Sequence, residues 1–105
     1  MKVDMKNYQG NYRKYYQKMT GHMIDKNVVV HHLNGNHYDC RIENLLAIDA
    51  FIHRNEHKNL IHIYNGTKPP YCEGEYLEWY NETKKEYDKA MKIKEEYLKI
   101  KEGSN

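Results

Sequence analysis

Residues 28–57 read VVVHHLNGNHYDCRIENLLAIDAFIHRNEH, and this stretch decides the fold. It opens on a β-branched run that continues through a pair of histidines, His31 and His32, before an Asn-Gly-Asn sequence at 34–36. β-Branched residues favour extended backbone, whereas Asn and Gly favour turns. The pattern therefore predicts a strand over about 27–33, with both histidines at its end.

The second half of the stretch predicts a return strand and a helix. Residues 42–48 are mostly apolar and indicate extended structure, and Asp49 stands where a helix N-cap is expected. From residue 50 to about 64 the apolar positions recur at roughly helical period, and Asn65-Gly66 is typical of a helix C-terminus. A loose hairpin followed by one helix is therefore the expected central unit.

A short helix is predicted before this unit, over about 11–20, where tyrosines alternate with Arg13, Lys14 and Lys18. Such a mixture suits contact with a phosphate backbone or stacking on bases. The same tyrosines at helical spacing also suit core packing. The sequence leaves both interpretations open.

A long helix is predicted after the central unit, from residue 73 to about 101. One side of it carries a stripe interrupted by polar residues: Tyr76, Tyr80, Thr83, Tyr87, Ala90, Met91, Lys94, Tyr97 and Leu98. Such a helix either folds back over the core or pairs with a second copy of the chain. A homodimer through this helix is thus one expectation and intrachain packing is the other.

Composition limits the class of protein. A chain of 105 residues fits one domain, here expected as a unit at 1–72 with its core at 22–64 and a helical extension at 73–105. The first part carries 10 Lys and Arg against 6 Asp and Glu, so attraction for a polyanion lies there. No apolar run is long enough to span a bilayer or to act as a signal peptide, so we expect no membrane partner and a cytoplasmic location. Two cysteines are too few for a disulfide framework or a four-cysteine zinc site.

The histidines suggest chemistry. Five of the seven lie between residues 31 and 57, and His53 and His57 stand at i and i+4 on the predicted helix, so both imidazoles point to one side. With a third imidazole from the strand end they would form a three-histidine metal site that leaves positions open for water and substrate. Neighbouring strand residues point to opposite faces, so His31 and His32 are expected to have different roles. The remaining histidines, His22, His37 and His62, are expected to be ordinary.

The segments V-H-H-L-N-G-N-x-x-D-C-R-I-E-N-L and H-R-N-E-H together resemble the HNH nucleases, over about residues 22–62. The final H-x-x-x-H spacing is similar to that of the colicin DNase branch, and the short chain is similar to free-standing phage and bacterial members. The resemblance implies an α+β fold with a ββα-metal (His-Me finger) core, between the short N-terminal and long C-terminal helices.

Carried onto this chain, the resemblance implies that His31, His53 and His57 hold one divalent metal and that His32 is the general base. Asn44 matches the residue whose amide fixes the loop between the strands and so helps to orient the base. The first metal position is His rather than the Asp of magnesium-preferring relatives, so Mg, Mn, Ni and Zn all remain candidates. Cys40 stands where many members have Asn, and the paired C-x-x-C zinc sites of larger members are missing.

The expected function is hydrolysis of phosphodiester bonds in DNA, nicking or cleaving the duplex with low sequence specificity. Cations that flank the predicted site, Arg41, Arg54 and Lys58, are candidates for contact with DNA, as are Arg13 and Lys14 on the predicted N-terminal helix. Two alternatives remain: a non-catalytic nucleic-acid-binding or phage regulatory module with a structural metal, and a nuclease that acts on RNA.

Overall fold

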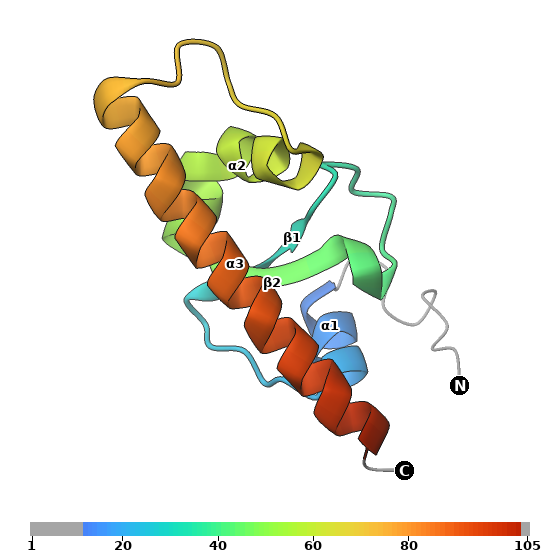
Figure 1. Cartoon of the computed structure of the whole chain (residues 1–105). Helices are drawn as coiled ribbons and strands as arrows, with labels where there is room; N and C mark the ends of the chain where they lie inside the picture. Colours follow the sequence, from blue (N-terminus) through green and yellow to red (C-terminus); the bar gives the residue numbers. More distant parts are fainter. Residues whose placement is uncertain (1–11, 104–105) are drawn as a thin grey trace.

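The computed structural model describes residues 12–103, and its architecture is α+β (Figure 1). The elements follow one another as α1 (Tyr12–Thr20), β1 (Val28–His32), the 3₁₀ turn η2 (Ile42–Asn44), β2 (Leu45–Asp49), α2 (Ala50–Asn65) and α3 (Gly74–Gly103). The predicted ββα core between a short N-terminal and a long C-terminal helix is confirmed. The predicted start of the first helix at residue 11 lies outside the described residues. No helix in the described range is long and apolar enough to cross a membrane.

The two strands form an antiparallel hairpin in which His31 pairs with Leu46 and His32 pairs with Leu45. The predicted extended segment at 42–48 is wrong in its first three residues, because 42–44 make a 3₁₀ turn and the strand begins only at Leu45. The turn completes the long connection between the strands, and its last residue, Asn44, is buried.

Helix α2 begins as predicted at Asp49, whose side chain accepts hydrogen bonds from the backbone N–H groups of Phe51 and Ile52. It ends at Gly66, whose left-handed φ of 73° closes the C-terminus. Between these caps the backbone departs from helical geometry at Glu56, with φ −123° and ψ 22°. The helix is therefore kinked one residue before His57.

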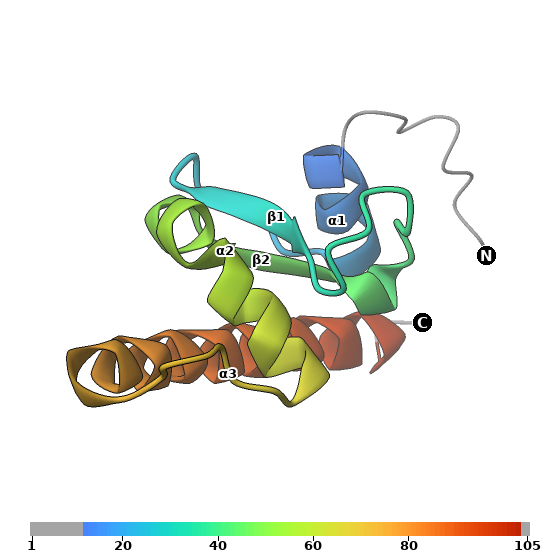
Figure 2. The same cartoon turned by 90° about the horizontal axis from the view of Figure 1, so that it is seen from above.

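The alternation of the strands divides the core in two. Leu45 packs with Tyr15, Tyr16 and Ile24 beside α1. Leu46 and Ile48 point the other way and pack with Leu33 and Leu60, and with Tyr87 of α3. In Figure 2, α3 runs along the lower edge of the view, and the hairpin and α2 lie on one side of it.

The long helix α3 buries the middle of its stripe against its own chain, while Tyr76 and Tyr97 near the two ends are exposed. Tyr80, Thr83, Tyr87 and Lys94 are buried, and the Lys94 ammonium donates a 2.7 Å hydrogen bond to the carbonyl of Ile42. The tyrosines at 15 and 16 in α1 are likewise buried. Intrachain packing thus covers the middle of the α3 stripe and the two tyrosines of α1, while Trp79 and Ile100 of α3 remain exposed.

Candidate metal and catalytic site

Three imidazoles meet between β1 and α2. His31 comes from the strand, and His53 and His57 come from the helix; their nearest ligand nitrogens all lie within 4.8 Å of one another. The ring centroid of His31 lies 5.1 Å from that of His53 and 5.2 Å from that of His57. The centroids of the two helical rings are 5.1 Å apart. The structure therefore brings together the three residues that the sequence predicted as metal ligands.

The position of each ring follows from local structure. Side chains alternate between the two faces of a strand. Val28 and Val30 pack on the α1 side of β1, so His31 lies on the opposite face, toward α2. His53 and His57 stand one turn apart on α2, so their rings lie side by side even across the kink at Glu56.

His31 is the most constrained of the three. Its side chain is fully buried, and neither ring nitrogen has a hydrogen-bond partner. Burial, followed by the nearby rings of His53 and His57, lowers the pKa of His31 to about 3. A buried nitrogen without a partner costs free energy, about 1–3 kcal/mol. A neutral imidazole with an unused lone pair is also the form that binds a divalent metal, so these residues fit such an ion.

His32 faces the opposite side of the strand. Its buried ring meets the edge of Tyr12 at a centroid distance of 4.7 Å and lies 4.8 Å from the ring of His37. Its Nε2 is 3.8 Å from the sulfur of Cys40. Burial, and next the proximity of His37, lowers the pKa of His32, so its ring is neutral near pH 7. A buried neutral imidazole can accept a proton.

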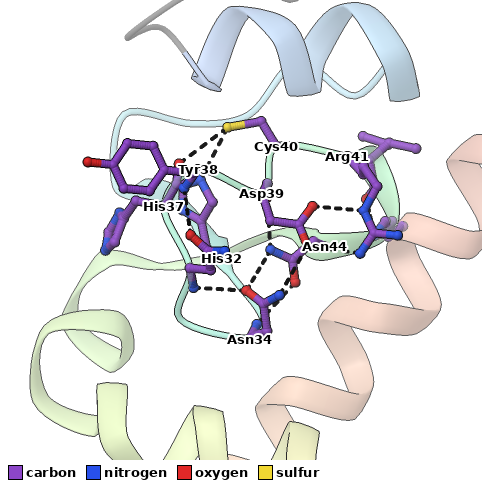
Figure 3. Close-up of polar contacts among 11 residues, drawn as sticks. His32, Asn34, His37, Tyr38, Asp39, Cys40, Arg41 and Asn44 are labelled. Atoms are coloured by element: carbon purple, nitrogen blue, oxygen red, sulfur yellow. Dashed lines mark hydrogen bonds and ion pairs between the residues drawn. The ribbon is translucent and has the colours of Figure 1, made fainter.

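Asn44 ties the loop between the strands together (Figure 3). Its Oδ1 accepts a 3.0 Å hydrogen bond from the backbone N–H of Asn34, and its Nδ2 donates to the Asn34 Oδ1 at 2.9 Å and to the carbonyl of Asp39 at 2.8 Å. The backbone of Leu33 also donates to the Asn44 carbonyl at 2.8 Å. Three of these four bonds join Asn44 to Leu33 and Asn34, the two residues that directly follow His32, and the fourth holds Asp39 further along the loop.

The middle of the same loop is held by an ion pair. Arg41 donates two hydrogen bonds of 2.8 Å to the carboxylate of Asp39, which also accepts a 3.0 Å bond from Asn34. The Arg41 bond is the main reason that the pKa of Asp39 is lowered to about 2, and the same pair raises the pKa of Arg41.

The cations predicted to contact DNA have different surroundings. Arg13 donates to the backbone carbonyls of Ile24, Asp25 and Val28, so its guanidinium joins α1 to the approach to β1. Arg41 is paired as described, and Lys14 lies exposed on α1. Arg54 and Lys58 are exposed on α2, each directly after one of the two helical histidines.

Sequence reasoning missed two neighbours of His32. His37 was expected to be an ordinary histidine, and Tyr12 was not singled out. The contact of Tyr12 with His32 joins two residues that are 20 positions apart in the sequence, and no local pattern contains it. Its hydroxyl also donates to the carbonyl of His37 at 3.3 Å, so the three residues form one cluster.

The region that contains these features matches a known family. Residues 13–54 match the family model described as HNH endonuclease, a span from α1 through the hairpin to His53. No curated protein and no solved structure gives a significant match to the chain. The match covers less than half of the chain and supports its resemblance to the HNH endonucleases. HNH domains are typically nucleases that act on nucleic acid with a divalent metal, and the histidine cluster is a possible place for such an ion.

Proposed function

We propose that this chain is a metal-dependent endonuclease that hydrolyses phosphodiester bonds in DNA and nicks or cleaves the duplex with low sequence specificity. The observation that carries the proposal is that two consecutive residues of β1 have different surroundings. His31 belongs to a three-histidine cluster, while His32 presents a buried neutral imidazole on the other face. Hydrolysis of a phosphodiester needs a metal and a base that reach the same phosphate, and the effect of His53 on the pKa of His32 supports the closeness of the two sites.

His31, His53 and His57 would hold the metal ion. A divalent ion there would neutralise charge on the reacting phosphate and on the leaving oxygen. An all-imidazole set accepts Mg, Mn, Ni or Zn and favours the later transition metals in affinity. The residues themselves converge from two elements and need no further side chain to complete a three-ligand site.

His32 would act as the general base. Its neutral ring would accept the proton of a water molecule as that water attacks phosphorus. Tyr12 and Cys40 limit rotation of the ring, and the Asn44 hydrogen bonds hold the loop that follows it. Asn44 therefore acts as a positioning residue in this mechanism.

DNA is the proposed partner, and Lys14, Arg54 and Lys58 are exposed cations proposed to contact its phosphates. The proposed nuclease domain comprises residues 1–72, and residues 73–105 form its helical extension. The packing of Tyr87 against Leu46 and Leu60 supports an extension that is docked on the domain. A cytoplasmic location in a bacterial or phage-infected cell remains a prediction.

The test is conversion of supercoiled plasmid by the purified protein with Mg, Mn, Ni or Zn added in turn. We expect metal-dependent nicking that His32→Ala slows by roughly 10²–10⁴-fold with little change in DNA binding. His62→Ala is the matched control, because His62 bonds to Thr67 at the far end of α2. Binding without cleavage by any ion would favour the non-catalytic module, and preferential cleavage of RNA would favour an RNA nuclease.

The same assay reports on the number of sites. A monomer with one site gives nicked circles before linear product, whereas a homodimer through α3 can cut both strands in one encounter. Sedimentation equilibrium of the same preparation tests the homodimer directly.

A further inference from the structure

Tyr38 stands on the loop beside His32 with its side chain almost wholly in solvent. Its exposed fraction is 96%, the highest of the large apolar residues in the described range. A tyrosine ring in this position contributes no burial to the folded state. In Figure 3 the ring projects outward from the loop, on the side of His37 and His32.

The loop that carries this ring is rigidly built. The backbone N–H of Tyr38 donates to the Asn36 side chain at 3.0 Å, and that of Asn36 donates to the Asn34 side chain at 2.8 Å. On the other side of Tyr38, Asp39 is held by Asn34 and by Arg41. The backbone that carries the ring is thus held in place, so binding of a ligand by the ring costs little backbone entropy.

The platform is close to the proposed base. His37, the residue before Tyr38, has its ring 4.8 Å from that of His32. A flat, exposed aromatic ring beside a phosphodiester-cleaving residue is suited to one ligand chemistry, the face of a nucleobase. The nucleotide next to the scissile phosphate supplies such a face.

We propose that Tyr38 stacks on an unpaired base next to the scissile phosphate, so that the enzyme prefers DNA with a locally unpaired nucleotide over perfect duplex. The inference rests on the proposed nuclease function. Within a perfect duplex both faces of a base are already covered by its neighbours, and extruding the base costs a few kcal/mol. A bulged or mismatched nucleotide presents its face at a much lower cost.

Binding tests the inference without requiring turnover. Two otherwise identical DNA duplexes carry 2-aminopurine, one in a perfect pair and one as a single-nucleotide bulge, and affinity and fluorescence are measured in EDTA with circular dichroism as the check on folding. We expect the wild type to bind the bulged DNA more tightly and to quench its fluorescence. Loss of one stacking contact in Tyr38→Ala should weaken that binding by roughly 5- to 100-fold.

Two variants make the result specific. Tyr38→Phe keeps the ring and should keep both the preference and the quenching. Tyr71→Ala removes another exposed tyrosine, 89% exposed in the connection between α2 and α3, and should change neither. Equal affinity of the wild type for the two duplexes, or equal losses in the Tyr38→Ala and Tyr71→Ala proteins, would overturn the inference.

Cleavage assays with metal separate this inference from the nuclease proposal. If Tyr38→Ala lowers kcat/KM on bulged DNA and leaves that on paired DNA unchanged, the stacking role is supported. If the bulge preference is present in binding but no metal supports cleavage, the stacking inference stands and the nuclease proposal fails.

Discussion

Asn44 and Asn34 bond to each other twice, once from backbone to side chain at 3.0 Å and once between their side chains at 2.9 Å. The two residues stand at opposite ends of the connection between β1 and β2. Their pairing closes this ten-residue separation into a fixed loop, and the loop begins two residues after His32. Loop geometry and the orientation of the proposed base therefore depend on the same side chain.

Asn44→Ala should lower both stability and cleavage. Removing the buried amide leaves the Asn34 N–H and the Asp39 carbonyl without their partner, a cost of about 1–3 kcal/mol in the free energy of unfolding. We expect kcat to fall while the metal affinity of the three histidines is retained, since Asn44 does not touch them. Urea unfolding, metal titration and plasmid nicking measure the three quantities. Asn55→Ala, at an exposed asparagine on α2, is the control. An Asn44→Ala protein with unchanged kcat would show that the loop does not position His32.

Removal of metal should destabilise the fold. The proposed ligands come from β1 and from α2, so a bound ion would join the two elements and would give the buried His31 imidazole a partner. A free metal concentration of 100 times Kd stabilises the folded state by about 2.7 kcal/mol. For a domain of this size that corresponds to a rise in Tm of roughly 10–20 °C.

Differential scanning calorimetry with each metal and with EDTA measures this shift. His57→Ala should lose most of the metal-dependent rise, whereas His62→Ala should keep it. A Tm that is indifferent to metal in the wild type would count against the three-histidine site.

Lys94→Ala should destabilise the protein by about 1–3 kcal/mol. Its ammonium is buried and donates to the carbonyl of Ile42, at the first residue of the turn that ends in Asn44. Lys94→Met retains most of the stem and avoids the cost of burying a charge, so it should recover part of the loss. Lys92→Ala, on the exposed side of α3, should stay within about 0.5 kcal/mol of the wild type. Guanidinium unfolding of the three variants gives the comparison, and equal stabilities of the Lys94→Ala and Lys92→Ala proteins would refute it.

The metal-free protein should lose stability in mild acid. His22 stacks on Tyr97 with ring centroids 4.2 Å apart, and burial lowers its pKa below the ordinary value of 6.5. As the pH falls through 6.5 the unfolded chain takes up a proton that the folded state resists, so stability is full above this pH and declines below it. His31, His32 and His53, whose pKa values are also lowered, act in the same direction.

His22→Phe isolates one part of this dependence, because phenylalanine keeps the stack and cannot be protonated. We expect its unfolding free energy in EDTA to fall less steeply between pH 6.5 and 5 than that of the wild type. Parallel curves for the two proteins would show that His22 does not contribute.

Local chemistry made much of the fold predictable. The β-branched run before His31, the Asp49 cap and the glycine after Asn65 each act within a few residues, and the strand and helix boundaries follow from them. The i, i+4 spacing of His53 and His57 is also local, so the grouping of their rings could be expected. The kink at Glu56 between them has no signal in the sequence pattern.

Contacts set by tertiary packing could not be predicted. The approach of Tyr12 to His32 depends on how α1 docks on the hairpin, and the bond from Lys94 to Ile42 joins residues 52 positions apart. Each was visible in the sequence only as a tyrosine or a lysine on a helix. Such pairings are decided by the packing of whole elements rather than by the residues near either partner.

Because two consecutive side chains point to opposite faces of this hairpin, each face can be changed by mutation without changing the other. The ring of His31 belongs to the histidine cluster, and the ring of His32 belongs to the cluster with Tyr12 and His37. A variant changed only at the His32 face keeps all the imidazole nitrogens of the His31, His53 and His57 cluster. If the proposed function holds, such a chain would bind DNA without cutting it and could be used to capture and sequence the sites that the wild type visits.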